Sequence, residues 1–277
     1  MANITAAEVN KLRKQTGAGM MDCKKALVEA NGDFEAAVDI LRKKGQKVAA
    51  KRSDRDANEG VVLAKTNEAQ NFGVLIVLNC ETDFVAQNAD FVAVAERVCE
   101  IALDKKPKTR EELVELEYQS GQSINAKLVE EIGKIGEKIQ ISSYDILQSD
   151  LIVPYNHPGN KIASMVALNE ASLKAEVAGR DVAMQVAAMN PVAVSPDQVD
   201  EAIRDRELAV GREQALEEGK PENMLDKIAQ GKLNKFYKEN TLMSQQFIKD
   251  NSQSVAEYLK SVDNDLQVID FRRQALI

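Results

Sequence analysis

The segment that decides the fold reads VLIVLN at residues 74–79, and a counterpart, SMVALN, lies about 90 residues later at 164–169. A shorter apolar run precedes each segment, at 61–63 and at 151–153. The residues between the runs include Asn in both copies, with Pro and Gly in the second, and such residues are typical of turns. The sequence therefore predicts two similar β-hairpins.

The residues after each hairpin keep the same order. Val92 aligns with Val182 at the same offset, in stretches that are predicted to be helical. A further strand is expected over 138–146, and another over 266–271 near the end of the chain. A hairpin followed by a helix that covers one sheet face is an α+β unit, so we expect the fold class α+β, with an internal duplication.

Residues 1–55 differ in charge from the rest of the chain. They hold 12 basic and 7 acidic residues, although the whole chain has 36 basic and 44 acidic residues and a net charge of −8. A capping box at Thr5 and Glu8, a glycine-containing break, and a cap at Asp33 indicate three helices, the last of which Gly45 is expected to end. The basic segment that follows is either a solvated linker or a tether for an acidic partner.

A long charged segment begins at Ser195 and Pro196, which are typical of a helix start. It is predicted to stay helical to about Glu218, to turn at 219–221 and to return as a second helix to about Glu239. We expect an antiparallel helical hairpin, serving as an interaction arm or as a structural insertion. The apolar residues expected to face one another are Val199, Ile203, Val210 and Leu216 on the first helix and Leu225, Ile228, Leu233 and Phe236 on the second.

These features divide the chain into three expected parts. Residues 1–55 would form the three-helix bundle and its basic linker. Residues 56–148 would form the first α+β subdomain, and 149–277 the second, with the helical hairpin inserted at about 195–239.

Asp83 and Phe84 form an unusual pair in the loop after the second strand, where the second copy has Leu173 and Lys174. An aromatic side chain in a loop needs a surface to bury against. In one interpretation Asp83 caps a helix and Phe84 folds back on the core. In the other, the pair protrudes as a wedge that disturbs a polar site and opens a partner protein.

Met20 and Met21 follow a glycine-containing loop at a predicted helix start. Because adjacent residues cannot both face the core of a small bundle, we expect one to be buried and the other to be exposed. An exposed methionine is an adaptable contact residue, so the pair is a candidate partner surface.

Composition excludes several classes of protein. The chain has one His and three Cys without a CxxC pair, and it has no phosphate-binding loop or GxSxG motif, so we expect no metal site, no cofactor and no catalytic centre. The negative net charge argues against direct nucleic-acid binding. No apolar run reaches the ~20 residues of a membrane span, and the N-terminus lacks a signal peptide, so a cytoplasmic location is expected.

Several segments together resemble the bacterial elongation factor Ts family. The first runs over 16–27 and reads TGAGMMDCKKAL, with Leu12 and Arg13 before it. The second is TDFV at 82–85, and the third is GKP at 219–221 with the Lys-rich helix behind it. The matching segments extend over nearly the whole chain.

The resemblance implies a guanine nucleotide exchange factor for elongation factor Tu, without catalytic activity. The bundle would be ubiquitin-associated-like and would dock through Arg13, Met20 and Met21. A second contact would come from His157. The wedge would displace Mg²⁺ from the partner's nucleotide site and would consist of Thr82, Asp83, Phe84 and Val85.

The resemblance also allows a homodimer within the complex. Some family members continue into a further helix, whereas this sequence stops soon after the last expected strand, so that helix's contact is not expected here. Two other classes stay open: a ubiquitin-associated-type binding module on a scaffold, and an enzyme that uses scattered carboxylates.

Overall fold

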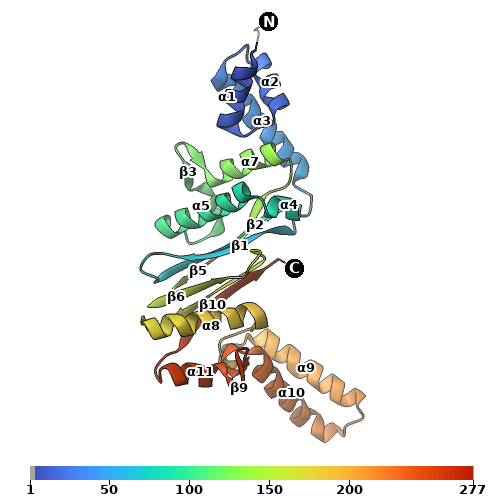
Figure 1. Cartoon of the computed structure of the whole chain (residues 1–277). Coiled ribbons are helices and arrows are strands. Elements are labelled where there is room, and N and C mark those ends of the chain that lie inside the picture. Colours follow the sequence, from blue (N-terminus) through green and yellow to red (C-terminus); the bar gives the residue numbers. More distant parts are fainter. Residues whose placement is uncertain (1–3, 277) are drawn as a thin grey trace.

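The computed structural model describes residues 4–276, in which two three-stranded antiparallel sheets form the body (Figure 1). The first has the order β1 (Glu59–Thr66), β2 (Phe72–Cys80) and β5 (Gln140–Gln148). The second has the order β6 (Leu151–Asn156), β7 (Ile162–Leu168) and β10 (Val268–Ala275). Both predicted hairpins are present, and in each sheet a later strand pairs with the second strand of the hairpin.

The two sheets pack face to face, and this explains why residues 74–79 are continuously apolar. Along β2, Val74, Ile76 and Leu78 point to the helical side of the first sheet, whereas Leu75 and Val77 point to the second sheet. A strand that is buried on both faces needs apolar residues at every position. The contact layer between the sheets consists of Val62, Ala64, Leu75, Val77, Leu147, Ile152, Ala163, Met165 and Ala167.

Polar contacts at the strand edges fix the two sheets against each other. The Asn156 side chain accepts a hydrogen bond from the Ala64 amide at 2.8 Å and donates one to the Ala64 carbonyl at 2.9 Å. The Val62 amide donates to the Asn160 carbonyl at 2.8 Å. The predicted turn of the second hairpin, at 156–160, therefore also contributes to the contact between the sheets.

Helices cover the outer face of each sheet, so the two sheets form the middle of the body (Figure 1). The first sheet is covered by α5 (Ala89–Lys105) and α6 (Arg110–Glu115), and α7 (Ile124–Ile135) lies farther out, where it packs against α6. The second is covered by α8 (Leu173–Met189), and α11 (Val255–Val262) packs against α8 farther from the sheet. Small hairpins, β3 (Glu117–Gln119) with β4 (Gln122–Ser123) and β8 (Gln246–Phe247) with β9 (Asp250–Ser254), lie among these helices.

The N-terminal helices are α1 (Ala6–Thr16), α2 (Met20–Glu29) and α3 (Phe34–Arg52). The prediction that Gly45 ends the third helix is wrong, because α3 continues to Arg52. A Cβ at Gly45 would lie 3.0 Å from the Val129 carbonyl oxygen, so the glycine allows α3 to lie close against α7. Packing against a neighbouring helix outweighs the cost of glycine in a helix, about 1 kcal/mol.

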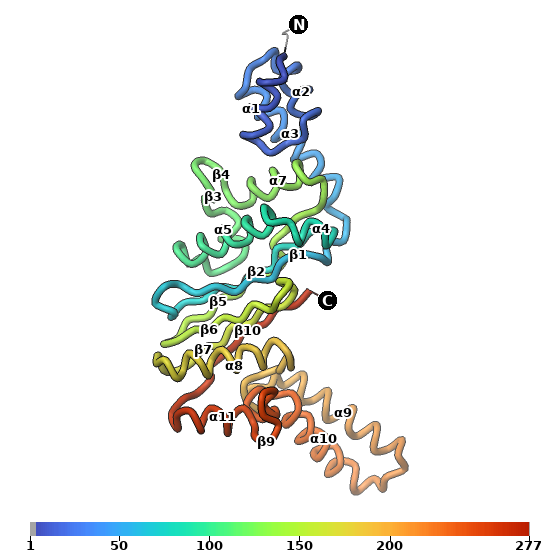
Figure 2. The backbone as a smooth tube through the Cα atoms, viewed as in Figure 1, coloured from blue at the N-terminus to red at the C-terminus, as the bar shows by residue number. Residues whose placement is uncertain are grey.

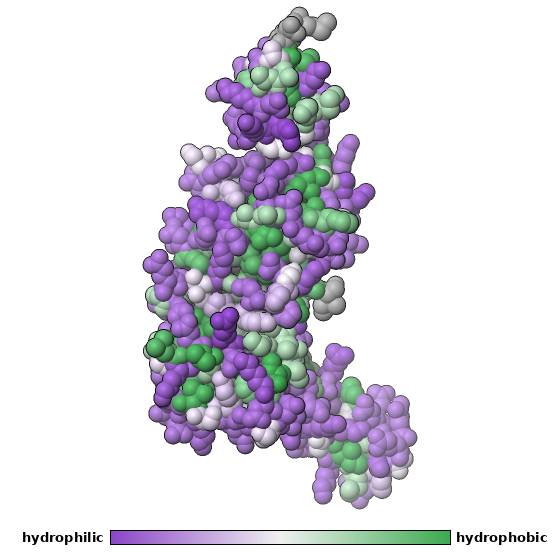
Figure 3. Space-filling view, viewed as in Figure 1, coloured by the Kyte–Doolittle hydropathy of each residue, from purple (hydrophilic) through white to green (hydrophobic). Residues whose placement is uncertain are grey.

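The predicted helical hairpin projects from the body as α9 (Glu201–Glu217) and α10 (Leu225–Asn240) (Figure 2). The first helix starts at Glu201 rather than at Ser195, because residues 196–198 form a separate 3₁₀ turn. Val210 and Leu216, which were expected at the contact, are exposed. The seam is narrower than predicted and consists of Gly211, Ala215, Leu225, Ala229 and Leu233, which leaves the arm largely hydrophilic on the outside (Figure 3).

The sheet contact gives a stability prediction. A Cβ at Gly73 would lie 2.6 Å from Ile152 Cγ2 and 3.0 Å from Met165 Sδ, both in the buried layer between the sheets. Gly73→Ala is therefore expected to lower the free energy of unfolding by about 1–3 kcal/mol through overpacking.

The matched control is Gly231→Ala on α10, where the added Cβ meets no atom within 4 Å. This change should raise stability by about 0.5–1 kcal/mol, since glycine is unfavourable inside a helix. Urea denaturation of both variants measures the difference. Equal stabilities would contradict the close approach of the sheets at Gly73.

Candidate functional site

The Asp83–Phe84 pair begins the short helix α4 (Asp83–Ala86), directly after β2. Thr82 is the N-cap residue, because its hydroxyl oxygen accepts a hydrogen bond from the Val85 amide at 3.4 Å. The interpretation that Asp83 is the cap is therefore wrong. The alternative that Phe84 folds back on the core is also wrong, because 83% of its surface is exposed.

The four residues of the predicted wedge divide into two that anchor and two that protrude. Val85 packs on the core of the first sheet, and Thr82 is half-buried. Asp83 and Phe84 are exposed, and within residues 4–276 the Asp83 carboxylate makes no hydrogen bond or ion pair. The wedge residues, as we call Thr82, Asp83, Phe84 and Val85 from here on, thus present one acidic and one aromatic side chain on an anchored turn.

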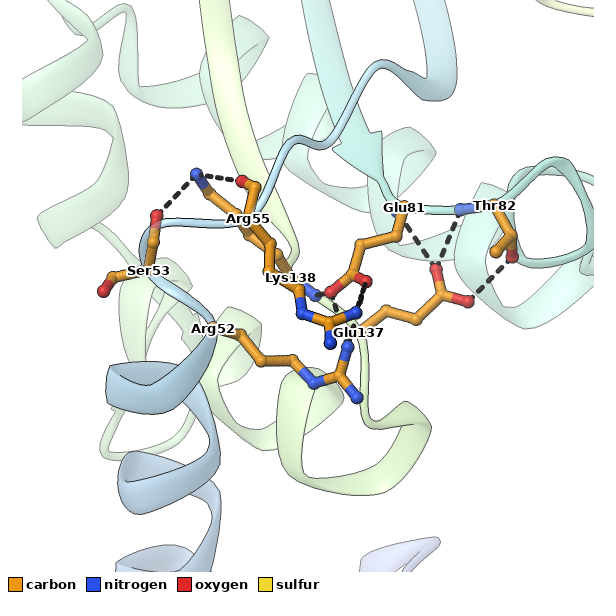
Figure 4. A network of polar contacts seen from close by, with 7 residues as sticks. All are labelled: Arg52, Ser53, Arg55, Glu81, Thr82, Glu137 and Lys138. Atoms are coloured by element: carbon orange, nitrogen blue, oxygen red, sulfur yellow. Dashed lines mark hydrogen bonds and ion pairs between the residues drawn. The ribbon is translucent and has the colours of Figure 1, made fainter.

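The start of the wedge is held by Glu137, which lies between α7 and β5 (Figure 4). Its carboxylate accepts hydrogen bonds from the Glu81 and Thr82 amides, both at 3.0 Å, and from the Thr82 hydroxyl at 2.7 Å. A carboxylate that accepts from backbone amides makes charge-assisted bonds, which are about twice as strong as neutral ones. Glu137 therefore fixes the backbone on the N-terminal side of Asp83.

The Glu81 side chain connects the wedge to the end of α3. Its carboxylate accepts hydrogen bonds from Arg52 at 2.8 and 2.9 Å, from Arg55 at 3.1 Å and from the Lys138 amide at 2.7 Å. Partial burial disfavours the charged form, but the Lys138 amide and the two guanidinium groups outweigh it and hold the pKa of Glu81 below its usual value. Glu81 is accordingly ionised at neutral pH.

The basic segment after α3 is tied to the body in a second way. The Lys138 ammonium group donates to the carbonyl oxygens of Ser53 at 2.8 Å and Arg55 at 2.9 Å (Figure 4). Arg52, at the end of α3, and Arg55, just after it, belong to the basic segment that was predicted as a linker or a tether, and both are paired with Glu81 of the same chain.

Cys80 lies just before the wedge and is buried. Burial, followed by the nearby charge of Glu137, raises the pKa of its thiol to about 12. The thiol is therefore protonated at neutral pH, and its 3.1 Å contact to the Thr82 carbonyl oxygen is structural.

Arg13, Met20 and Met21 lie on the surface of the N-terminal bundle. The prediction that one methionine is buried is wrong, because 52% of Met20 and 62% of Met21 is exposed. The core face of α2 is supplied by Cys23, Ala26 and Leu27, so neither methionine is needed for packing. Two exposed methionines make an apolar surface patch at the start of α2.

His157 is exposed in the turn between β6 and β7. Its Nδ1 atom is 2.9 Å from the Tyr155 hydroxyl oxygen, and the two ring centroids are 6.0 Å apart. The predicted site residues therefore lie on three separate elements: the bundle, the turn after β2 and the β6–β7 turn. Glu81, Glu137 and Lys138 were not predicted as site residues, because no local pattern in the sequence marks a carboxylate that accepts from an amide 55 residues away.

Across 4–276, no group of three or more His, Cys, Asp or Glu side chains could hold a metal ion. No helix in the same range is long and apolar enough to cross a membrane.

The exposed Phe84 on its anchored turn and the exposed Met20 and Met21 on the bundle are side chains of the types enriched where proteins contact one another. The family described as Elongation factor TS matches residues 81–276, a range that includes the wedge. The chain belongs to the elongation factor Ts family, and its role is that of a nucleotide exchange factor in translation elongation.

Full-length relatives agree with this assignment. The chain is 56% identical over 276 residues to the elongation factor Ts of Christiangramia forsetii, and the match covers 100% of both chains. It is 52% identical to the protein of the same name from Amoebophilus asiaticus, with 98% of each chain covered. It is 50% identical to that of Porphyromonas gingivalis, with 99% of this chain and 98% of the relative covered.

Proposed function

We propose that the chain is the guanine nucleotide exchange factor for elongation factor Tu and acts in the cytoplasm without a cofactor. The observation that carries the proposal is the exposure of Phe84 on a turn held at both ends. Burying a phenylalanine side chain contributes about 1.5–3 kcal/mol, and this energy becomes available only when the wedge enters a partner.

The proposed mechanism has the wedge displace Mg²⁺ from the nucleotide site of the GTPase. Mg²⁺ needs near-ideal octahedral geometry and is usually held by few protein groups together with the nucleotide phosphates, so a small displacement of that site weakens GDP binding. Phe84 would push between elements of the partner, and the unpaired charge of Asp83 would disturb the ligands of the metal. The nucleotide-free GTPase is then the state that the factor stabilises.

Linkage sets a quantitative condition on this mechanism. By whatever factor the chain weakens GDP binding, GDP weakens the binding of the chain by the same factor. A surface that docks firmly and a wedge that disturbs the nucleotide are therefore both required. The chain needs no catalytic acid or base for this role.

In the proposed function, the three parts of the chain have separate roles. Residues 1–55 would be a ubiquitin-associated-like bundle that docks through Arg13, Met20 and Met21. Residues 56–148 would carry the wedge, and the similar subdomain 149–277 would make a second contact through His157. The strand orders β1–β2–β5 and β6–β7–β10 support a duplication of the two subdomains.

Two alternatives are weaker. A ubiquitin-associated-type module on a scaffold would leave the exposed Phe84 without a role. An enzyme that uses scattered carboxylates is disfavoured because the carboxylates of Glu81 and Glu137 are already occupied by Arg52 and by backbone amides. A homodimer is not part of the proposal, since a single copy of the chain carries every residue that the proposed mechanism uses. The helical arm could be either an interaction limb or an insertion.

Phe84→Ala tests the proposed function. At saturating concentration of the factor, the variant should release GDP from elongation factor Tu at least about tenfold more slowly, by the loss expected for an aromatic hot spot. Its half-maximal concentration should change much less, because docking is spread over other surfaces. Leu173→Ala is the matched control, since Leu173 is also 83% exposed and occupies the corresponding place in the second subdomain.

Stopped-flow release of a fluorescent GDP analogue gives both quantities. A wild-type maximal rate for Phe84→Ala would show that the wedge is assigned wrongly.

Asp83→Asn tests the role of the metal. No hydrogen bond within residues 4–276 depends on the Asp83 charge, so the thermal midpoint should stay nearly constant while exchange in the presence of Mg²⁺ slows. The defect should shrink when a chelator removes Mg²⁺, because the assisted step is then complete.

Asp90→Asn, at an exposed acidic residue in the first turn of α5, serves as the control and should behave as wild type in both conditions. An equal Asp83→Asn defect with and without Mg²⁺ would argue against metal displacement by this charge.

A further inference from the structure

The wedge helix α4 is too short to hold its own orientation. It spans four residues, whereas isolated helices shorter than ~12–15 residues are marginal in water. Val85 and Ala86 pack against the core, which anchors the C-terminal side of the wedge. The direction in which Phe84 points therefore depends on what holds the residues that precede it.

Those residues are held by a reciprocal contact between two chain segments, which we call the clasp: Glu81, Thr82, Glu137 and Lys138 (Figure 4). The Glu81 amide donates to the Glu137 carboxylate at 3.0 Å, and the Lys138 amide donates to the Glu81 carboxylate at 2.7 Å. Each segment thus gives the other a backbone donor and a carboxylate acceptor. Neither segment can shift alone without leaving a carboxylate or an amide unpaired.

Within the clasp, the Thr82 hydroxyl has two partners that fix its rotamer. It donates to Glu137 at 2.7 Å and accepts from the Val85 amide at 3.4 Å. The cap of the wedge helix is therefore oriented by Glu137. Removal of this carboxylate would free the hydroxyl and two amides together, and the four-residue helix would lose its fixed entry angle.

The clasp is itself anchored to the helix that leads from the N-terminal bundle. Glu81 pairs with Arg52, the last residue of α3, and Lys138 holds the carbonyl oxygens of Ser53 and Arg55. The wedge, the segment before β5 and the end of α3 thus form one connected polar unit. Docking of the bundle then fixes where the wedge lies.

From this geometry we propose that Glu137 is a positioning residue for nucleotide exchange, which holds the wedge in the orientation that inserts Phe84. The inference rests on the proposed function. Glu137 contacts neither the nucleotide nor its metal in this proposal. It acts through Thr82 and the backbone, so its removal should impair insertion more than docking.

The experiment measures GDP release from elongation factor Tu with Glu137→Ala and Glu137→Gln. Glu137→Ala should lower the maximal release rate by at least about tenfold, the loss expected when hydrogen bonds to a charged group fail. The half-maximal concentration should change less than threefold, as expected if docking is intact. Glu137→Gln keeps one acceptor oxygen and should recover part of the rate.

Glu130→Ala is the matched control. Glu130 lies on α7, the helix that precedes Glu137. Glu130→Ala removes an ion pair with Lys127 and a hydrogen bond from Gln122, and neither contact involves the wedge. Its maximal rate should be that of wild type. A Glu130→Ala defect equal to that of Glu137→Ala would overturn the proposal, because general destabilisation would then explain both.

A double-variant cycle with Phe84→Ala gives the decisive readout. If Glu137 acts only by aiming Phe84, Glu137→Ala should cause little further loss in a chain that already lacks the aromatic ring. If the rate losses of Phe84→Ala and Glu137→Ala multiply in the double variant, the positioning role is overturned. If Glu137→Ala does not fold, the same cycle with Glu137→Gln decides the question.

Different results would contradict the proposed function and the positioning role of Glu137. A wild-type rate for Phe84→Ala alone would remove the wedge and with it the proposed function. A strong Phe84→Ala defect combined with a wild-type rate for Glu137→Ala would leave the wedge in place and overturn only the positioning role.

Discussion

The burial of β2 on both faces is the constraint on which the other features depend. Leu75 and Val77 pack against the second sheet, while Ile76 and Leu78 pack against the helices of the first. A strand held from both sides cannot shift its register without turning apolar side chains into the wrong layer. The chain leaves this fixed strand at Cys80 and reaches Asp83 after only two residues, so the wedge starts from a rigid base.

The clasp extends this rigidity past the end of the strand. Glu137 comes from the segment that leads into β5, the strand that pairs with β2, so the sheet itself brings Glu137 and the wedge together. Glu81 then carries the connection to Arg52 at the end of α3. If the wedge enters the partner as proposed, little of the docking energy would be spent on ordering it, which is the general advantage of preorganisation.

The sequence predicted those features that depend on local periodicity. The run at 74–79 and its counterpart at 164–169 located both hairpins. The wedge role of residues 82–85 rests on the resemblance and stays a proposal. Prediction failed where contacts between distant elements decide the outcome. Gly45 lies inside a helix because α7 approaches it, and the seam of the arm uses Gly211 and Ala215 instead of larger residues. The exposure of both Met20 and Met21 follows from a core face that three other residues of α2 already fill.

The clasp illustrates the same limit at the site. Glu137 is one of 44 acidic residues, and only the pairing of β5 with β2 brings it to the wedge. Whether the wedge is held before any partner binds can be measured directly by amide hydrogen exchange of the free protein. The amide protons of Glu81 and Thr82, which donate to Glu137, should exchange far more slowly than those of Glu68 and Ala69 in the β1–β2 turn, and Glu137→Ala should abolish the protection. Exchange at Glu81 and Thr82 as fast as at Glu68 and Ala69 in the wild-type chain would contradict a preformed wedge.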